Sequence, residues 1–153
     1  MRLEASIVVP QTNEQVWRFF EDYSNLAKWD RSVAQVVPTS AAPFGVGSTF
    51  DTIAPARKSS GKEGLRMSYR VTEYMPNHHV NILLTYSPMF TFAEWVIATE
   101  SLSEGVRITC QLDFALRPRR SFLLPVLLLT YRGAFRRDLT YLKQAIEQNE
   151  CAK

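Results

Sequence analysis

Residues 106–116 read VRITCQLDFAL, a stretch in which every second residue from Val106 onward is apolar. Such alternation is typical of a β-strand that is buried on one face. At 121–148, after a short basic stretch, apolar residues recur at spacings of three and four, as they do along one face of an α-helix. The sequence therefore predicts a sheet face and a helix stripe that cover each other, either as a filled core or around a cavity for an apolar ligand.

Length and composition favour one globular domain. The chain has 153 residues and 46% hydrophobic content, enough for a substantial core, and we expect a single domain at 1–149 with a short tail at 150–153. The net charge is +3, and the basic residues are spread along the chain instead of forming an arm. This distribution does not favour a nucleic-acid partner.

The N-terminal segment and the cysteines bear on location and metal binding. Met1 to Pro10 has a strand pattern and lacks the features of a secretory signal, so we expect a cytoplasmic protein. Cys110 falls on the inward face of its strand and Cys151 lies in the polar tail, so we expect two free thiols. The His and Cys spacing predicts no metal site, and we recognise no motif for a cofactor.

Strand patterns and turn residues alternate along most of the chain. After the first strand, an N-cap candidate at 10–13 opens a short helix that ends near Tyr23, and a helical turn follows at 24–29. A polar loop is expected at 55–64. This order favours an antiparallel sheet with helices on one side, an α+β fold. The seven predicted strands lie at 3–9, 32–39, 48–53, 65–74, 80–86, 90–99 and 106–116.

Several short motifs are similar to one known superfamily. The segment Val16–Trp29 resembles the opening of the Bet v 1-like superfamily of START and polyketide cyclase/dehydrase domains, also called SRPBCC proteins. Gly45–Phe50 is similar to its turn into the third strand, and Val71–Pro76 resembles its Val-x-Glu-x-x-Pro phrase. The resemblance implies a helix-grip fold, in which a seven-stranded curved antiparallel sheet wraps around a long C-terminal helix, with two short helices between strands one and two.

The resemblance also implies a function. Members bind or transport small hydrophobic ligands such as lipids and polyketides in a cavity between sheet and helix, and some are cyclases or dehydratases. Family membership does not determine a reaction. In this sequence Trp29 matches a Trp near the cavity mouth, and Phe50 matches a strand-three position close to the same end.

Further cavity-lining candidates follow from alternation alone. Each of them can equally be a residue of a packed core. From the sheet they are Met67, Tyr69, Val71, Ile82, Leu84, Cys110, Leu112 and Phe114, and from the helix they are Leu127, Tyr131 and Phe135.

An enzyme of this kind requires an acid or base inside the cavity. Glu94 lies between Phe92 and Val96, so on an inward face it would be buried and suited to proton transfer. If Trp95 and its neighbours of the same parity face inward instead, Glu94 is solvated. Tyrosines, among them Tyr69, Tyr86 and Tyr131, are candidate donors to a ligand carbonyl.

The apolar run Phe122–Leu129 contains Pro125 and is too short to cross a bilayer. Arginines flank it on both sides, which is compatible with lying on an anionic membrane surface and with membrane-surface lipid delivery. Burial in the core and a dimer interface are the alternatives, and both a monomer and a homodimer remain open. The flanking residues are Arg119, Arg120, Arg132, Arg136 and Arg137.

Gly133 lies in the middle of the predicted helix, where glycine costs about 1 kcal/mol relative to alanine. A close contact between helix and sheet would explain it. A notch for ligand passage or a kink in the helix is the functional alternative.

Overall fold

The computed structural model describes residues 1–41, 43–56 and 63–152, so most of the polar loop expected at 55–64 lies outside the described residues. Within them, the strands are β1 (Arg2–Val9), β2 (Gln35–Pro38), β3 (Thr49–Ile53), β4 (Arg66–Met75), β5 (His79–Tyr86), β6 (Phe90–Leu102) and β7 (Gly105–Leu116). The helices are α1 (Asn13–Phe20), η1 (Tyr23–Asn25), α2 (Leu26–Trp29), η2 (Pro118–Leu123) and α3 (Leu124–Cys151), where η denotes a 3₁₀ helix.

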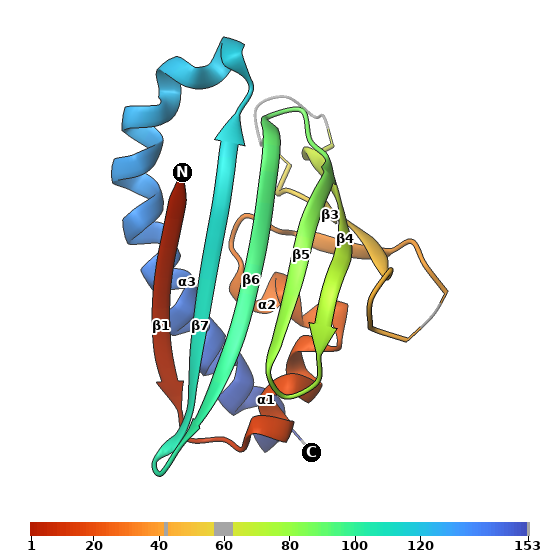
Figure 1. Ribbon diagram of the computed structural model, residues 1–153, viewed down its shortest axis with the longest axis vertical. Helices are drawn as coiled ribbons and strands as arrows, with labels where there is room; N and C mark the ends of the chain where they lie inside the picture. Colours follow the sequence, from red (N-terminus) through yellow and green to blue (C-terminus); the bar gives the residue numbers. More distant parts are fainter. Residues whose placement is uncertain (42, 57–62, 153) are drawn as a thin grey trace.

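The described strands form one seven-stranded antiparallel sheet in the order β1-β7-β6-β5-β4-β3-β2. Figure 1 shows α3 running along the face of the sheet behind β1 and β7, with α1 and α2 on the same side behind β4 to β6. The predicted α+β class and the helix-grip fold are therefore confirmed.

Burial follows the predicted alternation in β7. Val106, Ile108, Cys110, Leu112 and Phe114 are buried, and their even-numbered positions face the helices. The buried side chains of α3, whose whole length is described, begin at Phe135 and continue through Leu139, Leu142, Ala145 and Ile146. From Phe135 onward α3 is thus packed on the sheet, whereas the side chains before Phe135 are at most half-buried.

The short helices are anchored by local and long-range hydrogen bonds. Thr12 caps α1 by accepting from the Gln15 backbone N–H at 3.3 Å, while the Gln15 side chain accepts from the Thr12 N–H at 2.9 Å. Trp17 Nε1 donates to Thr99 Oγ1 on β6 at 2.8 Å, and Asn25 Nδ2 donates to the Phe19 carbonyl at 2.9 Å. These bonds hold α1 and the start of α2 against one end of the sheet.

Three sequence expectations need correction. The helix α3 continues to Cys151, so the tail expected from residue 150 begins inside the helix. The second strand starts at Gln35 and not at residue 32, because Ser32 instead bonds to Asp30 in a turn. Gly133 is exposed and an added Cβ there would meet open space, so a close contact with the sheet does not explain it.

The thiol expectation is confirmed, since Cys110 and Cys151 are both free, the first buried and the second exposed. None of the described helices combines the length and apolar composition that crossing a bilayer requires.

Candidate functional site

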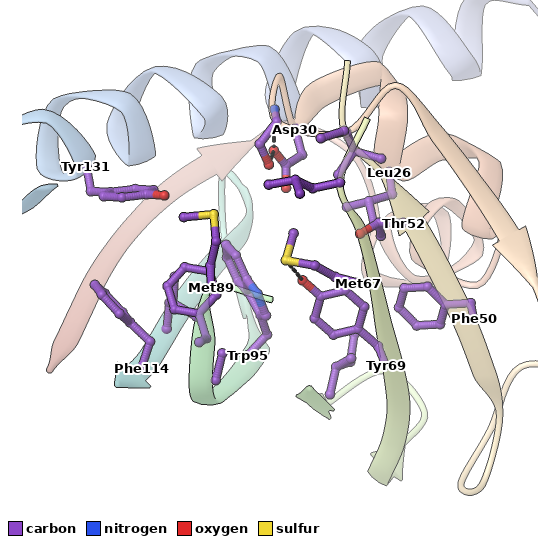
Figure 2. A pocket seen from close by; sticks show the side chains of 18 of the residues that line it. Leu26, Asp30, Phe50, Thr52, Met67, Tyr69, Met89, Trp95, Phe114 and Tyr131 are labelled. Carbon is purple, nitrogen blue, oxygen red and sulfur yellow. Dashed lines mark hydrogen bonds between the residues drawn. The ribbon is translucent and has the colours of Figure 1, made fainter. Parts of the chain in front are cut away.

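A cavity of about 210 Å³ lies between the sheet, the α2 region and the N-terminal half of α3. Most of its lining is apolar, and Figure 2 shows side chains from the sheet and from α3 pointing into the same space. The lining includes Leu65, which is 47% exposed, and Ser32, which is also exposed, so the cavity reaches the surface at both places.

Eight of the residues singled out in the sequence lie in this lining. They come from α2, from four strands and from α3, and so the fold brings together positions that are distant in the chain. These residues are Trp29, Phe50, Met67, Tyr69, Ile82, Leu112, Phe114 and Tyr131.

Five other candidates do not lie in the cavity lining. Val71 and Cys110 are completely buried in the packed core, and Leu84 packs against that core from β5. Phe135 is buried with its ring stacked on Trp95, and Leu127 is half-buried on α3. Alternation identifies the inward face of a strand, but the distance between that face and the helix decides which positions border an open space.

The structure also places Glu94 outside the cavity. In the register of the sheet, Glu94 lies opposite Asp113 and Leu83, whereas its neighbours Ala93 and Trp95 lie opposite Phe114 and Leu112. Ala93 and Trp95 line the cavity, so Glu94 points to the other face of the sheet. The candidate role of Glu94 as a buried acid or base is wrong.

Sequence reasoning missed part of the lining on β6. Both faces of this strand carry large apolar residues, so the pattern did not show which face is inward. A β-bulge between Phe90 and Phe92 shifts the pairing by one residue and brings Phe90 to the same side as Ala93. Trp95 is recognisable only from its pairing with Leu112, which the sequence does not reveal.

The polar groups of the lining include Asp30, Thr52, Tyr69 and Tyr131. Asp30 follows α2, and its Oδ1 accepts from the Ser32 backbone N–H at 2.9 Å and from the Ser32 hydroxyl at 2.6 Å. Burial raises the pKa of Asp30, while these two bonds oppose the rise. This carboxyl group at the edge of an apolar cavity was not singled out from the sequence, because a single Asp after a short helix has the pattern of an ordinary turn.

The Tyr69 hydroxyl lies within the cavity lining beside Met67. Its Oη donates to the sulfur of Met67 at 3.8 Å, a weak acceptor, as drawn in Figure 2. Burial raises the pKa of Tyr69, the charge of Asp30 adds to the rise, and the nearby Thr52 hydroxyl opposes it. Burial likewise raises the pKa of Tyr131, with a further contribution from Asp30. Both phenols therefore stay protonated at neutral pH.

A surface groove continues from the cavity between the segment after α2 and α3. Asp30, Ser32, Trp95, Leu112 and Tyr131 border both spaces. On the α3 side of the groove, burial raises the pKa of Asp138 to about 6, and the charge of Asp30 adds to this rise. The guanidinium of Arg31 lies 4.3 Å from the centroid of the Tyr141 ring, so the segment after α2 is attached to α3 beside the groove.

The apolar run at 122–129 is not buried as a unit. Phe122 is 75% exposed, Val126 62% and Leu129 84%, and all three lie on η2 or the first turns of α3. The exposed Arg119, Arg120 and Arg132 lie in the same region of the chain. Burial of the run, one of the sequence alternatives, is therefore excluded for these three side chains.

Comparisons with solved structures support the fold. The chain is similar to TTHA0849 from Thermus thermophilus, with a TM-score of 0.77 and 16% identity over 97% of this chain and 99% of that one. It is also similar to the di-domain ARO/CYC StfQ from the steffimycin biosynthetic pathway, with a TM-score of 0.74 and 12% identity over 97% of this chain and 51% of that one.

A third similar structure, Ara h 8.0201, has a TM-score of 0.64 and 12% identity over 93% of this chain and 97% of that one. At these identities the likeness concerns the fold alone. A comparison with curated proteins finds no match.

The sequence match is more specific than the structural one. Residues 1–147 match the family described as polyketide cyclase/dehydrase and lipid transport. This match covers almost the whole chain, and it agrees with the helix-grip architecture and with the motifs between Val16 and Pro76. The chain belongs to the polyketide cyclase/dehydrase and lipid transport family.

Proposed function

We propose that the protein binds a small hydrophobic molecule in the cavity between the sheet and α3, as a carrier or binding module. The observation that carries this proposal is an apolar space of about 210 Å³ that opens to the surface. Transfer of apolar surface from water into such a space contributes roughly 25 cal/mol per Å² buried. A ligand of a few rings or a short chain would fill the volume.

Paired aromatic rings form part of the cavity wall. Phe50 and Tyr69 stack with ring centroids 5.4 Å apart, and Phe90 meets Phe114 edge-on at 5.7 Å. Phe114 on β7 also meets the Tyr131 ring on α3, with centroids 6.1 Å apart, so this pair joins the sheet to the helix. The paired rings give the cavity flat apolar walls, which suit a flat or elongated apolar ligand.

A fluorescent, uncharged probe tests the proposal. N-phenyl-1-naphthylamine should gain fluorescence on binding, and Ala93→Trp should weaken its binding at least tenfold, because Ala93 is buried in the cavity lining. The control is Ala115→Trp on β7, where the side chain is exposed on the other face. Equal probe affinity in the two variants would contradict a binding site in this cavity.

A second filling variant guards against a folding defect in the first. Met67 lines the cavity but is only half-buried, so Met67→Trp should be better tolerated and should also weaken probe binding. Far-ultraviolet circular dichroism shows whether each variant is folded. If both folded variants bind the probe as the wild type does, the proposal fails.

Exposed apolar residues favour a second candidate function, delivery of the ligand at a membrane surface. Phe122 and Leu129 project from η2 and the first half of α3, and Leu128 and Tyr131 of the same helix region are only half-buried. Arg119 and Arg120 on η2 provide positive charge beside them. Apolar side chains flanked by arginines suit insertion into the headgroup region of an anionic bilayer.

Vesicle flotation tests this second function. Phosphatidylcholine vesicles with phosphatidylserine should retain the protein, and vesicles without it should retain less. Phe122→Ser with Leu129→Ser should abolish retention, whereas Val46→Ser, which changes a 67% exposed residue elsewhere, should not. Retention that is the same for all of these proteins excludes the membrane function and leaves the binding function standing.

A further inference from the structure

Thr52 is a buried hydroxyl group that makes no hydrogen bond of good geometry. Its side chain is 2% exposed on β3 and lines the cavity. The Tyr69 hydroxyl lies near its Oγ1, but within the described residues no donor or acceptor meets this oxygen at hydrogen-bonding distance and angle. Nearly all buried polar groups in folded proteins are hydrogen-bonded, so an unpaired one beside an open space indicates a position for a ligand or a water molecule.

Asp30 and Tyr69 have hydrogen-bonding capacity left at the same space. Both hydrogen bonds of the Asp30 carboxyl group go to Oδ1, and within the described residues Oδ2 receives none. The Tyr69 hydroxyl donates only to the weak acceptor sulfur of Met67, so its oxygen lone pairs can accept. Figure 2 shows Thr52 and Tyr69 on one side of the cavity, Asp30 beneath α3, and Phe114 and Trp95 on the opposite side.

The charge in the lining has one sign. Among the described residues that line the cavity, Asp30 is ionisable with a negative charge and none is Lys or Arg. Arg31 and Arg137 border the adjoining groove instead. A ligand carboxylate in the cavity would face Asp30 without a compensating cation, and like charges repel strongly where little water is present.

We propose that Asp30, Thr52 and Tyr69 form a polar subsite that recognises a neutral hydrogen-bond donor of the ligand, such as a hydroxyl group, and disfavours a carboxylate. The apolar body of the ligand then lies against Trp95, Phe90 and Phe114. This inference rests on the proposed binding function and narrows it: the ligand class is a hydroxylated hydrophobe, such as a phenol or an alcohol, and not a free fatty acid.

Three naphthalene probes separate the effects of the apolar ring, of a hydrogen-bond donor and of a negative charge on ligand affinity. Calorimetry should show that 2-naphthol, which can donate, binds the wild-type protein at least tenfold more tightly than 2-methoxynaphthalene, which cannot. The anion 2-naphthoate should bind more weakly than either. The ring system is the same in all three, so differences report the polar subsite.

Variants assign the preference to residues. Thr52→Val keeps the side-chain shape and should reduce the preference for 2-naphthol over 2-methoxynaphthalene several-fold. Asp30→Asn removes the charge and should strengthen 2-naphthoate binding about tenfold. Glu94→Gln, which removes a charge on the opposite face of the sheet, is the matched control and should change none of the three affinities.

The outcomes distinguish the two proposals. If 2-methoxynaphthalene binds as tightly as 2-naphthol to the wild type, the polar subsite is refuted while the binding function stands. If Asp30→Asn and Glu94→Gln affect 2-naphthoate equally, the role of Asp30 is refuted. Failure of all three probes to bind the wild-type protein refutes both the subsite and the binding function.

Discussion

Trp95 on β6 and Phe135 on α3 stack with ring centroids 5.6 Å apart and ring planes inclined by 30°. Trp95 lines the cavity and Phe135 does not, so this contact marks the boundary between the open and the packed half of the space under α3. Toward the C-terminus of α3, Leu139, Leu142 and Ile146 fill the interior. The cavity therefore has a defined end.

Truncation of Phe135 should destabilise the protein. Phe135→Ala removes a buried ring that stacks on Trp95. The free energy of unfolding should therefore fall by about 3 to 5 kcal/mol, as measured by urea denaturation. Phe122→Ala removes the same kind of side chain at an exposed position, so it should change the free energy of unfolding by less than about 0.5 kcal/mol. Equal effects of the two substitutions would contradict a stabilising contribution from the stacked pair of Trp95 and Phe135.

Two glycine substitutions should act in opposite directions. Gly133→Ala adds a Cβ into open space on a helix and should raise the free energy of unfolding by up to about 1 kcal/mol. Gly105→Ala should lower it, because φ is +142° and the new Cβ would lie 2.0 Å from the Val9 carbonyl oxygen. Thermal denaturation measures the stability of both variants. Destabilisation by Gly133→Ala would contradict the open space that the structure shows around this position.

The cysteines should differ sharply in reactivity. Complete burial raises the pKa of the Cys110 thiol to about 12, and Cys151 is exposed near the end of α3. An Ellman titration should detect one thiol in the native protein and both in denaturant. Cys151→Ser should abolish the native signal, and a persistent signal would mean that the core around Cys110 opens readily.

Stability should depend on the protonation of Asp138. Its pKa is raised by burial and then by Asp30 to about 6 from 3.8, so the folded state binds the proton more tightly than the unfolded chain does. The free energy of unfolding contributed by this group is therefore highest at low pH and decreases as the pH rises from about 4 to about 6. Because the carboxyl group is partly exposed, we expect the change to be no more than about 1 kcal/mol.

Asp138→Asn provides the comparison for this pH effect. Denaturation at a series of pH values should show a smaller decrease across this window in the variant than in the wild type. Asp30 remains in both proteins and contributes in the same direction, since burial raises its pKa as well. Identical pH profiles for the two proteins would contradict the assignment to Asp138.

Local patterns were sufficient for the fold class, and the family resemblance implied the helix-grip arrangement. The alternation at 106–116 identified the inward face of β7, and the helical spacing at 121–148 indicated an apolar face of α3, on which the structure buries Leu139, Leu142 and Ile146. Thr12 was within the expected N-cap segment. These features depend on interactions between near neighbours or on which face of one element is apolar, so a single sequence records them.

The site depended on relations that no single segment contains. The bulge in β6 and its register with β7 decided that Trp95 faces inward and Glu94 outward. The packing of α3 only from Phe135 onward decided that Tyr131 borders a space while Cys110 lies in solid core. The burial of Asp30 arose only because the segment after α2 meets both the sheet and α3.

The sequence by itself determined which faces of the strands and of the last helix are apolar, because that information lies in the period of each segment. Only the tertiary structure decided where those faces touch and where they stand apart. The separation of two packed elements depends on their crossing geometry, on strand register and on side chains contributed by remote parts of the chain.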